Sequence, residues 1–168
     1  MNLKDTIEVH GVLTIKTIDS LTGVILDEEV GENCILNTGL ALIALSITAA
    51  GAPPVTILQL GGNVTKEIVT DVPSTSNGSL TVRPSDFLPI NSYSIIPGKT
   101  LFKCLIGPAY ANSGTGNATY NEAVLMYKIS EDPVTYGWFA RKTFNDKIKN
   151  SSLIFELNWE ITFEYKSA

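Results

Sequence analysis

Residues 153–163 read LIFELNWEITF, and this stretch decides the fold class of the chain. Apolar residues occupy every second position, and the residues between them are polar apart from Ile154. Because side chains on a β-strand point to opposite faces with a period of two, the pattern predicts a long strand with one apolar face. That face carries Leu153, Phe155, Leu157, Trp159, Ile161 and Phe163. Such a strand favours a β-sandwich or barrel over a nucleotide-binding α/β fold.

Earlier parts of the chain also predict strands. Residues 7–18 alternate in the same way, and turn-forming residues at 19–23 lead into a second strand at 24–30, which together indicate a hairpin. Later candidates lie at 55–60, 80–82, 93–96, 101–106, 122–129 and 136–144. These strands predict an all-β, antiparallel β-sandwich of the jelly-roll or immunoglobulin-like type, built as one domain over residues 1–168.

One short α-helix is predicted near residues 38–48. The apolar residues that recur there with helical spacing are Leu40, Ile43, Ala44 and Ile47. Asn37 or Thr38 can cap the start of the helix, and the Pro53-Pro54 pair prevents its continuation. We expect the apolar face of this helix to pack against the sheet.

Composition limits the possible partners. The net charge of -5 and the scattered basic residues predict no nucleic-acid partner. A loose group at Lys142, Lys147 and Lys149 is interpreted as a solvated loop. The N-terminal residues do not resemble a secretory signal, and the apolar run at 39–47 is too short for a bilayer, so we expect a soluble protein made in a cytoplasm, with no membrane partner.

Catalytic and metal-binding patterns are weak. His10 is the one histidine, it lies in the polar phase of the first strand, and no nucleophile-elbow motif accompanies it. Cys34 and Cys104 belong to no CxxC or Cys/His cluster, and the sequence leaves open whether they pair. The glycines at 61–62 lack the Lys-Ser/Thr of a phosphate-binding loop. We therefore expect no enzyme, cofactor or metal site.

Contact surfaces have better candidates. The small and turn-forming residues at 107–119 predict a long surface loop, which carries Tyr110 and Asn112. Tyr136 and Trp138 flank a glycine on one predicted strand face. Such an aromatic pair can stack on a sugar, anchor a protein interface or lie at the edge of a core. These four residues are the interface candidates.

Several motifs together resemble a loose class of small virion structural proteins of tailed bacteriophages. The motifs are Leu21-Thr22-Gly23, the run from Asn33 to Leu40, Leu60-Gly61-Gly62, Tyr120-Asn121-Glu122-Ala123, the run from Phe139 to Phe144, and the run from Leu157 to Phe163. The resemblance covers nearly the whole chain. It implies a non-enzymatic building block that contacts copies of itself and other virion proteins, as a tail or fibre adaptor or as a capsid decoration. A free glycan-binding module is the alternative.

Overall fold

A computed structural model describes residues 6–48, 51–62, 67, 87–112 and 116–166. In chain order the elements are β1 (Thr6–Asp19), β2 (Ile25–Ile35), α1 (Asn37–Thr48), β3 (Val55–Gly61), β4 (Phe87–Pro89), β5 (Ser92–Ile96), β6 (Lys99–Ile106), β7 (Ala118–Glu131), β8 (Val134–Lys149) and β9 (Leu153–Lys166). Neighbouring strands pair in the order β4-β3-β7-β8-β2-β1-β9-β6-β5, always antiparallel. The predicted all-β class and the predicted helix are both confirmed.

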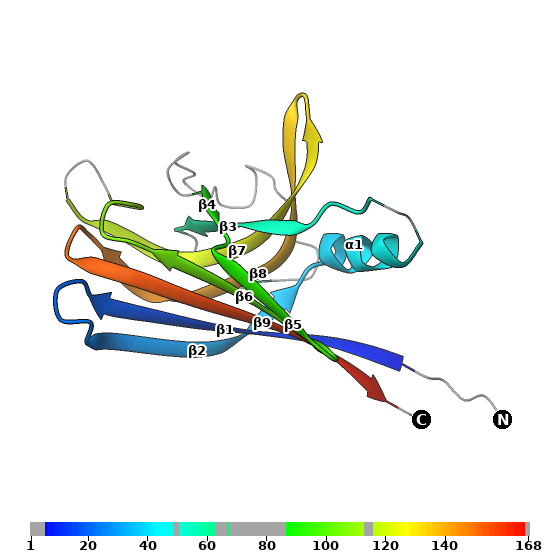
Figure 1. Ribbon diagram of the computed structural model, residues 1–168, viewed down its shortest axis with the longest axis horizontal. Helices are drawn as coiled ribbons and strands as arrows, with labels where there is room; N and C mark the ends of the chain where they lie inside the picture. The colour runs from blue at the N-terminus through cyan, green and yellow to red at the C-terminus, as the bar shows by residue number, and fades with distance from the viewer. Residues whose placement is uncertain (1–5, 49–50, 63–66, 68–86, 113–115, 167–168) are drawn as a thin grey trace.

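The sheet bends at β2. This strand pairs with β1 from Ile25 to Asn33 but with β8 only at Cys34 and Ile35. The strands β3, β7 and β8 therefore form a group that lies above β1, β2 and β9 (Figure 1). Apolar side chains from both groups share one buried core, whose members include Leu13, Leu60, Leu125 and Trp159. The structure is thus a single curled sheet that surrounds its core.

The last strand has the alternation that its sequence predicts. Phe155, Leu157, Trp159 and Ile161 are buried, with at most 1% of their surface exposed, whereas the intervening Glu156, Asn158 and Glu160 are half-buried. β9 pairs with β1 along one edge and with β6 along the other, so it is a central strand of the sheet. The strand is therefore paired along both edges, and its apolar side chains belong to the core.

The indole of Trp159 has a polar partner inside the core. When the Asn33 carboxamide is oriented by its hydrogen bonds, its nitrogen donates to the Gly11 carbonyl at 3.0 Å and its oxygen accepts from Trp159 Nε1. The carboxamide fits only because position 11 is glycine. A Cβ at that position would lie 1.7 Å from the nearest atom of the Asn33 carboxamide. Gly11 and Asn33 together satisfy a buried donor that would otherwise be costly.

One prediction about a loop is wrong, and another is confirmed only in part. Lys142, Lys147 and Lys149 lie on β8 instead of a solvated loop, and the last two are buried, because β8 continues well beyond the predicted strand end at 144. The segment 107–119 is only partly a surface loop, since Ala111 is buried beneath the Tyr120 hydroxyl, which donates to the Ala111 carbonyl at 3.0 Å. The predicted strand at 80–82 lies outside the described residues.

Candidate interaction surface

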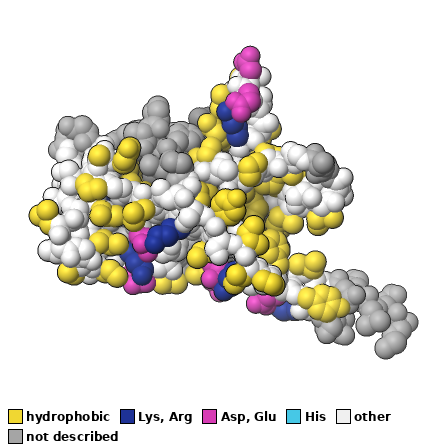
Figure 2. All heavy atoms as spheres, viewed as in Figure 1, with side chains coloured by type: hydrophobic (Ala, Val, Ile, Leu, Met, Phe, Trp, Pro, Cys, Tyr) yellow, Lys and Arg dark blue, Asp and Glu magenta, His cyan; other side chains and the backbone are white. Residues whose placement is uncertain are grey.

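An apolar groove opens between α1 and the neighbouring strands β5, β6 and β9. Its volume is about 500 Å³, and none of its lining residues is charged. The main contributors are Leu42 and Ile43 from α1, Tyr93 and Ile95 from β5, Phe102 from β6 and Phe163 from β9. Figure 2 shows apolar side chains gathered between the helix and the strands beside it. Such a groove suits an apolar occupant.

The first turn of α1 is fixed firmly to β8. Gly39 packs so closely on the backbone of Phe139 that a Cβ would lie 2.2 Å from its carbonyl oxygen. Beside it, the Thr38 hydroxyl donates to the Trp138 carbonyl, and the Tyr127 hydroxyl donates to the Thr38 carbonyl at 3.3 Å. Desolvation at this site raises the pKa of Tyr127. These contacts set the position and the rotation of the helix.

That rotation contradicts the predicted buried face of α1. Leu42 and Gly39 are the buried residues, while Leu40 is 42% exposed and Ile47 is 79% exposed. Ala44 is also exposed, and of the four predicted residues only Ile43 packs against the core. The reason is the close contact at Gly39, which turns the side of the helix centred on Gly39 and Leu42 toward the sheet. An apolar stripe formed by Leu40, Ala44 and Ile47 is left facing outward on a side of the helix that does not line the groove.

β5 forms the opposite wall of the groove and is an edge strand of the sheet. All five of its residues are exposed, and Tyr93 and Ile95 leave 71% and 73% of their surface uncovered. An exposed apolar edge strand can pair with another chain, and proteins usually protect such edges. The groove therefore lies between Leu42 and Ile43 of α1 on one side and an apolar sheet edge on the other.

The four residues proposed from the sequence as contacts are not brought together at this groove. Tyr110 is 63% exposed, whereas Trp138 is only 8% exposed and packs in a second small cluster with Leu36, Val124 and Met126. Tyr136 is half-buried against the same cluster, on the β7–β8 hairpin that projects from the rest of the molecule (Figure 1). Of the roles that the sequence left open for the pair, the core edge describes Trp138.

Asn112 holds a buried lysine. Its side-chain oxygen accepts from Lys149 Nζ at 3.1 Å, and its nitrogen donates to the Pro108 carbonyl at 2.5 Å. Lys149 also donates to the Asn150 carbonyl at 3.0 Å and is fully buried. Burial lowers its pKa from 10.5 to about 8. Asn112 therefore has a structural task, which is to fasten the 107–112 segment to the end of β8.

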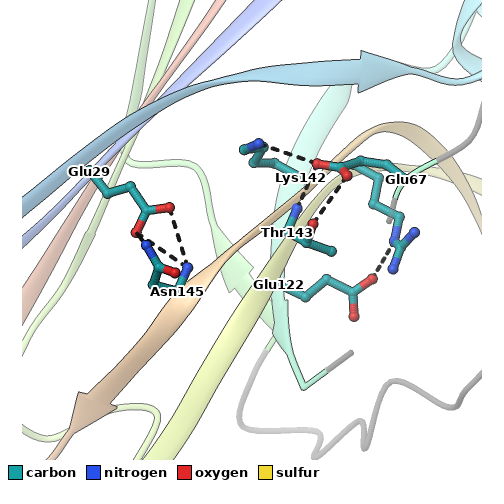
Figure 3. Close-up of polar contacts among 7 residues, drawn as sticks. Glu29, Glu67, Glu122, Lys142, Thr143 and Asn145 are labelled. Atoms are coloured by element: carbon teal, nitrogen blue, oxygen red, sulfur yellow. Dashed lines mark hydrogen bonds and ion pairs between the residues drawn. The ribbon is translucent and has the colours of Figure 1, made fainter. Parts of the chain in front are cut away.

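A polar network follows β8 where it separates from β2 (Figure 3). Glu29 of β2 accepts from the backbone and side-chain nitrogens of Asn145, and Lys147 Nζ lies 2.8 Å from Glu29 and 2.6 Å from Asp27. Desolvation lowers the pKa of Lys147, but the hydrogen bonds to Asp27 and Glu29 outweigh it and raise the pKa overall. Side chains thus bridge the two strands after their backbone ladder ends.

Two further carboxylates bind to β8. Glu67 accepts from the Thr143 backbone nitrogen at 2.9 Å and from its hydroxyl at 3.1 Å, and it lies 3.4 Å from Lys142 Nζ. Desolvation raises the pKa of Glu67. The hydrogen bonds and the charge of Lys142 outweigh this effect, so the pKa lies below its ordinary value. Glu122 of β7 and Arg141 form an ion pair that is almost completely buried. Because both groups are buried, removal of either partner would leave an uncompensated charge in the interior.

The remaining candidate residues lie apart from one another. His10 is exposed on β1 and contacts Glu8 at 3.1 Å. Cys104 lies opposite Leu157 and is buried, which raises its thiol pKa to about 12, while Cys34 lies opposite Arg141; no disulfide joins them. Among the described residues, no group of three or more metal-ligand side chains converges. In the same part of the chain, no helix has the length and apolar character needed to cross a bilayer.

Comparison with protein-family models, with curated proteins and with solved structures finds no match to the chain. Neither the groove nor the exposure of the apolar stripe of α1 was predicted from the sequence. The signal is the helical spacing of Leu40, Ala44 and Ile47, which by itself predicts a face buried in the core of the same chain.

Proposed function

We propose that this protein is a non-enzymatic structural subunit of a tailed-bacteriophage virion, made in the bacterial cytoplasm and working through protein–protein contacts. Its curled sheet corresponds in this proposal to a β-sandwich used as a building block. A tail or fibre adaptor is the first choice for its position, and a capsid decoration is the second. The motifs described above support this class, because they resemble proteins of such particles.

One observation carries the assembly role. The stripe Leu40, Ala44 and Ile47 has the helical spacing of a buried face, yet it is exposed in the single chain. A contiguous exposed apolar surface often marks a protein interaction site. A chain that works by assembly accounts for this surface.

The alternative, a free glycan-binding module, has less support. That function needs an exposed aromatic platform on which a sugar ring can stack. Trp138, the larger member of the proposed pair, is 8% exposed and packs among apolar side chains. A glycan array with the purified chain tests this alternative directly.

Mass spectrometry of purified phage particles that encode this chain tests the proposal. We expect the chain in the particles at a fixed copy number: roughly three, six or twelve for a closed ring in the tail, or on the order of hundreds for a capsid decoration. The variant His10→Ala should incorporate as well as the parent, because His10 is exposed on β1 away from the groove. Absence of the chain from washed particles would refute the proposal.

A further inference from the structure

We propose that Lys149 and Asn112 join through an isopeptide bond, a covalent crosslink that forms within the folded chain. The bond links Lys149 Nζ to Cγ of the Asn112 side chain, and one molecule of ammonia leaves. The virion role does not require this crosslink, so the two proposals are independent. The crosslink is supported by the contact between the two side chains, the burial of the lysine and the surroundings of its amine.

The two reacting groups are already in contact where the 107–112 segment meets the end of β8. Lys149 Nζ lies 3.1 Å from Asn112 Oδ1, the oxygen bonded to the carbon that the amine attacks. The amide nitrogen is held as well, because Asn112 Nδ2 donates to the Pro108 carbonyl at 2.5 Å. Groups held together in this way react as if their concentration were very high, roughly 10⁵ M or more in well-oriented cases. The fold therefore supplies the proximity that a lysine and an asparagine in solution lack.

The surroundings of Lys149 favour its neutral, nucleophilic form. In the described part of the chain its nitrogen has two hydrogen-bond acceptors, Asn112 Oδ1 and the Asn150 carbonyl, and no carboxylate pairs with it. Two acceptors match the two hydrogens of a neutral amine, whereas an ammonium group has three hydrogens to satisfy. Desolvation lowers the pKa of Lys149 to about 8, so far more of this amine is neutral near neutral pH than in an exposed lysine.

Lys147, two residues earlier on β8, provides the contrast. Its amine lies 2.6 Å from Asp27 and 2.8 Å from Glu29. Desolvation lowers the pKa of Lys147, but the hydrogen bonds to these two carboxylates outweigh it, so the amine is held as a cation. An ammonium group has no lone pair with which to attack a carbonyl carbon. Two buried lysines on one strand therefore differ in the property on which the reaction depends.

The reaction is an aminolysis of the asparagine side-chain amide, and it needs no oxidant, reductant or second reagent. The lone pair of Lys149 Nζ attacks Asn112 Cγ, and the Nζ–Cγ bond forms. The Cγ–Nδ2 bond then breaks, one hydrogen of Nζ moves to Nδ2, and ammonia leaves. The Asn150 carbonyl accepts from Nζ at 3.0 Å and holds the amine in place, while the Pro108 carbonyl accepts from the departing nitrogen. Because Lys149 is fully buried, water is excluded from competing attack.

The product suits its surroundings better than the separate side chains do. Ala118, which lies opposite Lys149 on β7, belongs to the apolar core, and so does Ala111 beside Asn112. In such a place an uncharged amide replaces an amine whose charged form is costly to bury. The crosslinked nitrogen no longer titrates, so the pH dependence that a buried amine gives belongs to chains that have not reacted.

The crosslink would close a ring in the chain. The ring runs from residue 112 to residue 149 and contains all of β7 and β8. A covalent link of this kind restricts the unfolded chain, as a disulfide does, and thereby favours the folded state. The segment that Asn112 fastens to β8 would then be held permanently.

Intact-mass spectrometry of the full chain tests the crosslink. We expect the folded chain to have lost the mass of one ammonia, at purification or during incubation at a pH of about 8, near the pKa of Lys149. Digestion with trypsin locates the bond, since trypsin does not cleave after an acylated lysine. The expected product is a branched peptide that joins residues 104–128 to residues 148–166.

Variants identify the two partners. Lys149→Met and Asn112→Ala each remove one reacting group, so each should keep the full mass of its sequence. The matched control is Lys147→Met, which removes the other buried lysine of β8 and should lose ammonia as the parent does. Circular dichroism checks that each variant folds, and the parent chain decides the outcome where a variant does not. An asparagine that cyclises to a succinimide also loses ammonia, but it links no second peptide.

Three results would overturn the crosslink: a folded parent chain that keeps its full mass after incubation for several days, a loss of ammonia without the branched peptide, or a loss that persists in Lys149→Met. A chain found in phage particles at its full mass overturns the crosslink alone. A crosslinked chain that is absent from particles overturns the virion role and leaves the crosslink intact.

Discussion

Gly11 and Asn33 face each other across the β1–β2 ladder, and the carboxamide of Asn33 occupies the space that a side chain at position 11 would need. The same carboxamide accepts a hydrogen bond from the buried indole of Trp159. The exchange of one hydrogen atom for a methyl group at Gly11 therefore disturbs three strands together, because Trp159 belongs to β9.

Gly11→Ala should lower the free energy of unfolding by about 1–3 kcal/mol, since the methyl group displaces Asn33 from its place over Trp159. Urea unfolding followed by tryptophan fluorescence measures the loss. Gly62→Ala is the matched control, because within the part of the chain that the structure describes no atom lies within 4 Å of a Cβ there. The control should change stability by less than about 0.5 kcal/mol. Equal stability of the two variants would contradict the packing described.

Two leucines of α1 test the rotation of the helix. Leu42 is 8% exposed and packs in the core, so Leu42→Ala should destabilise the chain by about 2–4 kcal/mol. Leu40 leaves 42% of its surface exposed and is not part of the core cluster, so Leu40→Ala should cost less, about 1 kcal/mol or below. The measurement is urea unfolding at a concentration low enough to keep the chain monomeric. A larger loss for Leu40→Ala than for Leu42→Ala would place the other helix face in the core.

The buried ion pair should depend on both partners. Arg141→Met leaves the Glu122 carboxylate in the interior without its guanidinium, and we expect a loss of about 3–5 kcal/mol. The double variant with Glu122→Leu should recover much of that stability, because no charge then remains buried at the pair. Lys128→Met removes an exposed pair with Glu131 and should cost at most about 1 kcal/mol. An additive double variant would show that the two side chains are not coupled.

Lys149 should make the chain more stable as the pH rises. Burial lowers its pKa to about 8 in the folded state, and its ordinary value is 10.5, so between these values the unfolded chain binds a proton that the folded chain does not. The free energy of unfolding rises with pH wherever the unfolded state binds more protons. The contribution of this group should therefore increase from about pH 8 to pH 10.5.

The comparison of wild type with Lys149→Met isolates that contribution. Cys104 titrates in part of the same range, but its effect is common to both chains. We expect the stability difference, wild type minus variant, to grow with pH across this interval. A difference that stays constant would show that Lys149 keeps its ordinary pKa in the folded chain.

The strands could be predicted because their pattern is local. Each alternating stretch, and above all residues 153–163, reports which side chains avoid water, and this is enough to locate most strands. The order of the strands could not be predicted in this way. The pairing of β1 with β9, and the meeting of β2 and β8 at only two residues, depend on contacts between distant parts of the chain.

The helix shows where a periodic pattern stops being informative. Spacing identified Leu40, Ala44 and Ile47 as residues suited to burial, but it does not say what buries them. Gly39 decides the orientation through its contact with the Phe139 backbone, and glycine adds nothing to a hydrophobic pattern. Similarly, the pairing of Glu122 with Arg141 depends on the register of β7 against β8, in which Val124 lies opposite Arg141, and no single strand reveals that register.

The pairing of β1 with β9 along their whole length also has a consequence for how the chain is made. β1 begins at Thr6 and its second neighbour begins only at Leu153, so β1 leaves the ribosome long before β9 does. Until β9 emerges, one edge of β1 has no strand beside it, and an unpaired edge can recruit another chain. Folding that waits for such distant contacts is slow and exposes the nascent chain to aggregation. Low temperature, which weakens hydrophobic association between exposed segments, should therefore raise the yield of native protein during expression.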